Sequence, residues 1–155
     1  MRASRMRGMT LAARPAIVIP TVPAAYRKAL VEHPLLMNAF ELRLLRVQHF
    51  GMGIKSYAKA LGVSERGIVR WESGERAPSR ANADALVSLI AYTDAAVAEL
   101  VASCPPNCVL VTYRTDDEFR EHERTGSWNL SAEWHNGVVW RAAQQIPGAR
   151  IDEAP

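Results

Sequence analysis

The chain is poor in features that mark secreted, membrane-spanning and metal-dependent proteins. Only two of its 155 residues are cysteine. No run of apolar residues approaches the ~20 that a membrane span needs, and Pro20 and Pro23 interrupt the most apolar stretch near the N-terminus. We therefore expect no secretion signal and no membrane partner, and we expect a cytoplasmic protein in which disulfides are rare.

Catalytic and metal-binding patterns are scarce as well. A glycine-rich phosphate loop and a nucleophilic serine on a tight turn are both missing. Cys104 and Cys108 flank a proline turn, and His122 and His135 are the obvious further ligands. This spacing does not match a zinc finger. The sequence predicts no enzyme, no catalytic residue, no bound metal and no cofactor.

What the chain does have is an uneven distribution of charge. Residues 1–37 hold six basic and one acidic side chain, residues 38–80 hold eight and four, and residues 81–155 hold five and eleven. A basic surface suits a polyanion such as DNA, whereas the acidic tail suits another partner. The charge distribution is equally compatible with a solvated surface that has no partner, so only sequence motifs can distinguish DNA binding from this alternative.

Composition divides the chain into three segments. Residues 1–37, rich in Arg, Ala and Pro, are expected to be a basic flexible arm. Met37-Asn38 is also a natural start for the next domain, in which case the native protein lacks the arm. Residues 38–102 are expected to form a helical DNA-binding domain. Prolines at 105 and 106 then break the chain, and residues 103–155 are expected to form a small α+β domain.

Periodicity and capping residues predict three short helices between residues 38 and 73. In the first, Asn38 and Glu41 resemble a capping box, and the apolar stripe is Phe40, Leu44 and Val47, with Leu45 beside them. The second covers residues 54–61 and ends at Gly62, and Ser64 can cap the third. The apolar side chains expected to hold the last two together are Ile54, Tyr57, Ala58, Leu61, Val63, Ile68 and Trp71. Two helices joined this way at a steep angle leave the second free to enter a major groove.

The string from Ser56 to Pro78 resembles the Xre/Cro-type helix-turn-helix of phage repressors and bacterial regulators. Its "LGVS…I..WE.G.R.P" pattern fixes core, turn and loop positions together. The resemblance covers about residues 38–95 and implies a bundle of four or five helices with a recognition helix at about 64–73. It implies DNA contacts from Ser64, Glu65, Arg66, Gly67 and Arg70 on that helix, and from Arg76 and Ser79 in the following loop.

Two positions depart from the family. The second helix usually starts with a polar pair whose amide grips a phosphate, and here the pair is Gly53-Ile54. Lys55, Ser56 or Lys59 is expected to supply a phosphate contact instead. Gly67 replaces a larger side chain, which lowers helix propensity by ~1 kcal/mol relative to alanine and lets the backbone approach DNA.

Side-chain chemistry suggests a role for each candidate. Arg66 and Arg70 can each make a bidentate contact to guanine, although Arg70 can equally pair with a neighbouring acid. Ser64 and the helix N-terminus can bind a phosphate. Glu72 is expected to be structural and paired with a nearby arginine. The candidates for positioning on the DNA backbone are Lys55, Lys59, Arg76 and Arg80.

A long apolar stripe follows the motif, formed by Leu86, Leu89, Ile90, Val97, Leu100 and Val101. Its first half is expected to cover the core of the bundle. Its second half, from Val97 onward, fits either core packing or a dimer interface, and repressors of this type often bind two half-sites as dimers. We expect a homodimer.

The last segment is predicted to be a β-α-α-β unit. The strands are expected at about 108–113 and 149–152, and the helices begin near Thr115 and Ser131. The second helix carries Trp134, Val138 and Ala142 on one stripe, and the tryptophans at 128, 134 and 140 are expected to be core rather than contact surface. The fold class is therefore mainly α, with a small C-terminal α+β unit.

These signals favour a sequence-specific, double-stranded DNA-binding transcriptional regulator, a repressor of phage or bacterial origin. The alternative is an antitoxin-type or other protein-interaction module whose acidic C-terminal half binds a partner protein.

Overall fold

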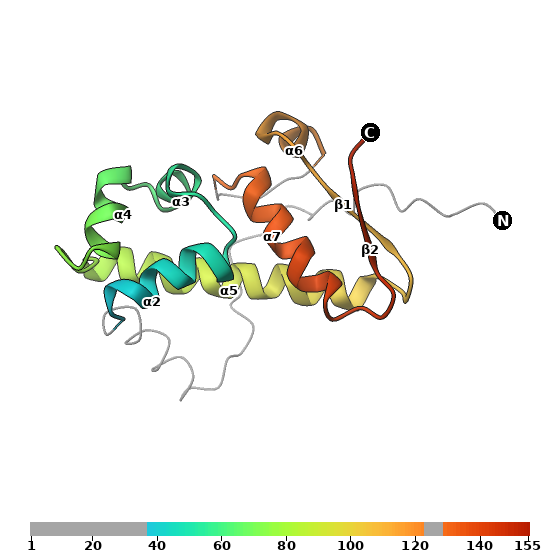
Figure 1. Cartoon of the computed structure of the whole chain (residues 1–155), viewed down its shortest axis with the longest axis horizontal. Helices are drawn as coiled ribbons and strands as arrows, with labels where there is room; N and C mark the ends of the chain where they lie inside the picture. The colour runs from blue at the N-terminus through green and yellow to red at the C-terminus, as the bar shows by residue number, and fades with distance from the viewer. Residues whose placement is uncertain (1–36, 123–128) are drawn as a thin grey trace.

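The computed structural model of the chain describes residues 37–122 and 129–155. The elements in chain order are α2 (Ala39–Leu44), the π-helix η1 (Leu45–His49), α3 (Ile54–Leu61), α4 (Glu65–Glu72), α5 (Arg80–Ser103), β1 (Val109–Thr112), α6 (Asp116–His122), α7 (Ala132–Ala143) and β2 (Arg150–Glu153) (Figure 1). The predicted fold class, a helical bundle followed by a β-α-α-β unit, is confirmed. The predicted arm lies outside the described residues, apart from Met37, and so does Trp128.

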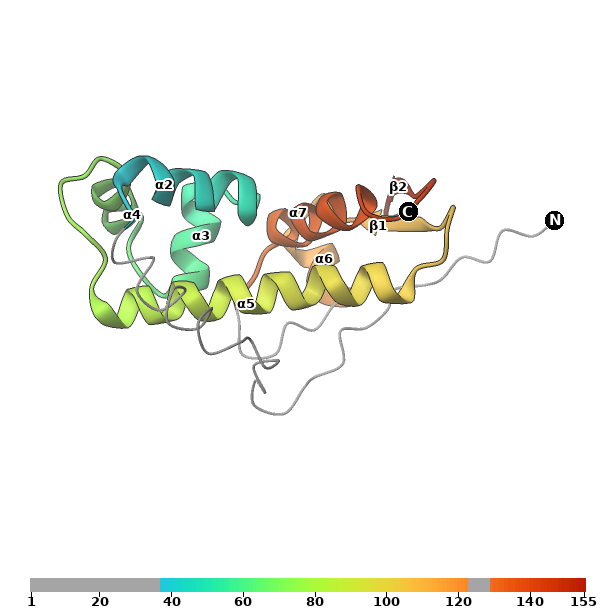
Figure 2. The same cartoon turned by 90° about the horizontal axis from the view of Figure 1, so that it is seen from below.

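The longest helix, α5, lies behind both halves of the molecule. Figure 2 shows α2 and α3 over its N-terminal half and α7 over its C-terminal half. Leu86 and Leu89 are fully buried, Val97 is buried further along, and the buried apolar residues of both halves form one cluster. Leu100 and Val101 are partly buried and pack against that cluster. This burial favours core packing over a dimer interface for the second half of the stripe, while the proposed division of the chain near residue 102 stays a prediction.

By length and composition, α5 is also able to cross a membrane. It has 24 residues, and its most apolar window has a mean hydropathy of 1.6. The expectation that no segment has this character was therefore wrong. Core helices of soluble proteins pass the same test, and 33% of the window is buried inside the protein.

The first helix buries a different stripe from the one that was predicted. Leu42 and Leu45 lie in the core, whereas Phe40 and Val47 are 66% and 48% exposed. Apolar residues occur on more than one side of this short helix, so helical periodicity is compatible with burial of either the predicted stripe or the observed one. The side of α2 that faces the core is determined by the residues that follow it, because the chain continues into η1 and reaches the fully buried Phe50.

Side chains cap the helices at the predicted residues. Asn38 and Glu41 form the reciprocal capping box of α2. The hydroxyls of Ser64, Thr115 and Ser131 each accept a hydrogen bond from the backbone N–H three residues later. Each cap satisfies an N–H that the first turn of a helix leaves without a partner, which explains why sequence located these helix starts well.

The two strands of the C-terminal unit pair in parallel, with Val109 opposite Arg150 and Thr112 opposite Glu153. Helix α7 packs between this sheet and α5 (Figure 2). Trp134 is fully buried and its indole N–H donates to the Thr93 hydroxyl at 3.0 Å. Trp140 is 61% exposed because it lies on the opposite side of α7, so the expectation of a core position was wrong for it.

The two candidate metal-ligand histidines make other contacts in this unit. The His135 ring is buried with its Nε2 at 2.9 Å from the Val111 carbonyl oxygen, and burial lowers its pKa. His122 stacks on Tyr113. Among the described residues, no group of three or more candidate ligands is placed to hold a metal ion.

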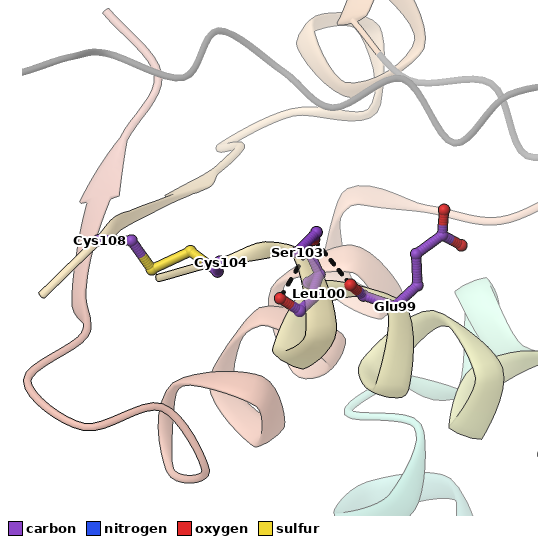
Figure 3. Close-up of a disulfide and its surroundings, with 5 residues drawn as sticks. All are labelled: Glu99, Leu100, Ser103, Cys104 and Cys108. Atoms are coloured by element: carbon purple, nitrogen blue, oxygen red, sulfur yellow. Dashed lines mark hydrogen bonds between the residues drawn. A yellow bond between two sulfur atoms is a disulfide. The ribbon is translucent and has the colours of Figure 1, made fainter. Parts of the chain in front are cut away.

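Cys104 and Cys108 form a disulfide, so the expectation of a chain without disulfides was wrong. The bond closes the turn between the end of α5 and the start of β1 (Figure 3). Just before it, the Ser103 hydroxyl donates to the carbonyls of Glu99 and Leu100 in the last turn of the helix. The crosslink ties the shared helix to the C-terminal sheet.

Replacing both cysteines by serine should lower the free energy of unfolding by about 2 kcal/mol, the loop-closure entropy of so short a loop. Urea titrations of the oxidised protein and of the Cys104→Ser/Cys108→Ser variant measure the difference. Dithiothreitol should destabilise the native protein and leave the variant unchanged. Equal midpoints for the oxidised protein and the variant would show that the crosslink adds nothing to stability.

Candidate nucleic-acid interface

The central feature is the α3–turn–α4 unit, which local chemistry builds as predicted. Gly62 ends α3 with a φ of 66°, a left-handed conformation that glycine adopts without strain. The Val63 N–H then donates to the Ala58 carbonyl at 3.0 Å. Ile68 and Trp71 of α4 are buried. One side of α4 is therefore committed to the core, and the other side faces out.

A buried ion pair fixes the far end of α4. The Arg46 guanidinium of η1 donates to both carboxylate oxygens of Glu72, at 2.6 and 2.9 Å, and to the Met52 carbonyl at 2.9 Å. Both charged side chains are only 10% exposed. The hydrogen bond to Glu72 raises the pKa of Arg46 and outweighs the opposing effect of burial. The structural role predicted for Glu72 is confirmed, whereas sequence reasoning missed Arg46.

The outward side of α4 carries the predicted reading residues. Ser64, Glu65 and Arg66 are exposed, and Gly67 is half-buried with its N–H bonded to the Ser64 hydroxyl. Since Ser64 uses its hydroxyl to cap the helix, its side chain is already engaged.

Val69 was missed by sequence reasoning. It is 48% exposed, one helical turn after Glu65 and Arg66. Its spacing from those two residues was the available signal. A solvent-facing valine among polar neighbours adds an apolar group to the outward side of α4.

Arg70 is engaged in an ion pair, one of the two alternatives weighed for it. Its Nε lies 3.1 Å from Oε1 of Glu75, with the two side chains 35% and 62% exposed. An exposed pair of this kind contributes little to stability, so a stronger ligand can displace it. Within residues 37–122 and 129–155, none of the ion pairs includes Arg66.

The candidates for backbone contacts fall into two groups. Lys55 and Lys59 are both exposed, one turn apart on α3, while Ser56 beside them is half-buried. Arg76 and Arg80 are exposed after α4, and Arg80 pairs with Asp84 at 3.2 Å. Ser79, placed near phosphate by the family resemblance, caps α5 through the Asn82 N–H.

The start of α3 holds an unexpected partner. The Gly53 N–H donates to Oε2 of Glu133, a residue of α7 that lies 80 positions later in the chain, at 2.8 Å. Sequence reasoning noted only that the family's usual phosphate contact is missing at Gly53-Ile54. A carboxylate from the C-terminal unit is hydrogen-bonded at that place.

These features define a class of protein. A short helix, a glycine turn and a second, capped helix that faces outward are the parts of a DNA-binding helix-turn-helix domain. The family model described as helix-turn-helix matches residues 42–94. These residues belong to that family, in its Xre/Cro-like form, which comprises DNA-binding regulator domains rather than enzymes. A search of curated proteins found no match to the chain.

Glu72→Ala should lower the free energy of unfolding by about 3 kcal/mol, because it leaves the Arg46 charge buried without its partner. Glu75→Ala, which removes an exposed pair, should cost less than about 1 kcal/mol. Chemical denaturation of both variants measures the contrast. The double variant Arg46→Met/Glu72→Leu should recover most of the loss, and similar values for the two single variants would contradict the assigned role.

Proposed function

We propose that the protein is a sequence-specific transcriptional regulator, a repressor, that binds double-stranded DNA with residues 64–73 in the major groove. The observation that carries this proposal is the outward side of α4, whose side chains the core does not require. The major groove is wide enough for one helix, and its base edges are distinct for every base pair.

Base reading is assigned to three side chains. Arg66, which forms no ion pair in the described part of the chain, is suited to the two acceptors of a guanine. Arg70 can make the same contact after exchanging Glu75 for the base. Val69 lies beside them, and its methyl groups suit the methyl of a thymine. Glu65 and the backbone at Gly67 complete this surface, since glutamate can accept from cytosine and a glycine allows close approach.

Positioning on the phosphates is assigned to the basic residues around α4. Lys55 and Lys59 flank it from α3, Arg76 from the loop after α4, and Arg80 from the first position of α5. Ser56 can add a hydroxyl contact, and so can Ser64, because a hydroxyl that accepts the capping bond still has its O–H to donate to a phosphate. Such contacts carry affinity and salt dependence but no sequence information.

Arg66→Ala should weaken binding to the selected operator by about 1–3 kcal/mol and relax preference at one base pair, whereas Lys59→Ala should weaken all sequences alike and reduce the salt slope by about one. The operator is first selected from a genomic fragment library, and fluorescence anisotropy at several salt concentrations measures both variants. Val69→Ala should lose discrimination at a thymine only.

Two outcomes would overturn parts of this proposal. Unchanged sequence preference in Arg66→Ala and Arg70→Ala would mean that α4 is not the reading helix. A reporter gene placed behind the selected operator tests the sign of regulation, and transcription that rises with the protein would replace a repressor by an activator.

We also propose that the protein acts as a cytoplasmic homodimer, paired through the groove between α2–η1 and α7. This groove has a volume of about 480 Å³, and Leu44 and Trp140 are among its lining residues. Phe40 and Val47 on the same helical segment, like Trp140, are unusually exposed for apolar side chains. Operators with two half-sites require two copies of the reading helix, which makes a second copy of the chain the occupant that fits the function.

Trp140→Ser should raise the dimer dissociation constant tenfold or more, as expected for a central aromatic anchor of about 1.4 kcal/mol or more. Sedimentation equilibrium over a wide concentration range measures the shift. Val109→Ser, which removes another exposed apolar side chain on β1, is the matched control. If the wild-type protein stays monomeric at high concentration, the proposed homodimer is wrong.

The alternative function, a module whose acidic C-terminal half binds a protein partner, is supported by three acids of α6, the exposed Asp117 and Glu121 and the half-buried Glu118. Co-purification of a basic partner with the tagged chain, lost when these three are replaced by their amides, would favour it.

A further inference from the structure

The contact between Glu133 and Gly53 joins parts of the protein with different roles. Glu133 is an exposed residue in the first turn of α7, and its carboxylate accepts a hydrogen bond from the N–H that precedes α3. Figure 1 shows the first turn of α7 next to α3. Its carboxylate is turned toward the helix-turn-helix domain rather than toward the N–H groups of its own helix.

Backbone packing holds this carboxylate in place. Gly51, in a left-handed conformation with a φ of 65°, packs against Gly137 on the same face of α7, and a Cβ added at Gly137 would lie 2.9 Å from the Phe50 carbonyl oxygen. One turn further, Arg141 donates to Asp94 of α5 at 2.8 Å. Glu133 therefore extends from a helix that is seated against the turn before α3, and its position follows from that seating.

The charge environment of Glu133 differs from that of Asp94, its neighbour in the same interface. Asp94 is flanked by Arg141 and by His49, whose Nε2 lies 3.3 Å away, and these contacts lower its pKa against the effect of burial. None of the ion pairs formed by residues 37–122 and 129–155 includes Glu133. The exposed carboxylate of Glu133 therefore lies beside the start of α3, and its charge is one of those that raise the pKa of the buried Arg46.

In a helix-turn-helix, the first helix of the motif crosses the DNA backbone. Helix N-termini attract phosphate through their free N–H groups and the helix dipole. In this protein a carboxylate takes the N–H of Gly53 and brings negative charge to that place. We propose that Glu133 sets the DNA affinity of the domain: it competes with a DNA phosphate at the start of α3, so that the C-terminal unit weakens binding. This inference rests on the proposed DNA-binding function.

Glu133→Gln tests the inference because glutamine keeps an oxygen that can accept the Gly53 hydrogen bond and removes only the charge. Its affinity for the selected operator should rise about threefold or more, the Coulomb effect of one charge about 6 Å from a phosphate in water. The salt dependence of binding should become steeper. Glu99→Gln is the matched control, since it makes the same charge change near the C-terminal end of α5, whereas α3 lies over the N-terminal half of that helix (Figure 2). It should leave affinity within twofold of the native protein.

Each outcome has one meaning. Native protein that binds no DNA sequence more tightly than random DNA would overturn the proposed function itself. Native protein that binds its operator, with Glu133→Gln equal to or weaker than it, would overturn only the role of Glu133. An equal gain in Glu133→Gln and Glu99→Gln would also overturn it, because the effect would then be one of net charge. Thermal unfolding of both variants verifies that the fold is retained.

Discussion

The bidentate contact between Arg46 and Glu72 is the interaction on which the arrangement of the short helices depends. One guanidinium bonds to the end of α4 and to the Met52 carbonyl just before α3, while its own backbone belongs to η1. Apolar contacts such as those of Ile68 and Trp71 hold the helices together but are not directional. The planar fork of the guanidinium is directional, so it fixes the angle at which α4 is presented to the solvent.

A second constraint is that both halves of the protein share α5. Residues of this helix are buried under the helix-turn-helix domain and, further along, under α7. The close contact of Gly51 with Gly137 joins the halves again, and so does Arg141 of α7, which donates to the His49 carbonyl of η1 and to Asp94 of α5. With a common core and a second contact surface, α7 has a fixed place beside the turn before α3.

Features that depend on residues close together in the sequence were predicted, and features that depend on residues far apart were not. Helix starts at Ser64 and Ser131 and the turn at Gly62 depend on groups within a few residues, so they were predicted correctly. Arg46 and Glu133 act on partners 26 and 80 positions away, and no local pattern pairs them. The first helix shows an intermediate case: its period was right, but its rotation depends on burial further along the chain, and Phe40 was placed on the wrong side. The disulfide depends on the 6.0 Å separation of the Cys104 and Cys108 Cα atoms across the turn, which a sequence does not show, and the expected cytoplasmic location argued against it.

Acidic side chains restrain the proposed DNA interface from two directions. Glu75 holds Arg70 on the reading helix, and Glu133 holds the N–H at the start of α3. For DNA to bind, Arg70 must exchange Glu75 for a base. Glu133 must either give up the Gly53 N–H to a phosphate or stay in place and repel that phosphate. Because α7 is part of the common core, it cannot withdraw Glu133 by a rigid swing without exposing buried apolar surface such as Trp134. On the proposal made for Glu133, the C-terminal unit therefore acts on the interface through a charge at a fixed position, and the net attraction for DNA should be smaller than the number of basic residues around α4 suggests.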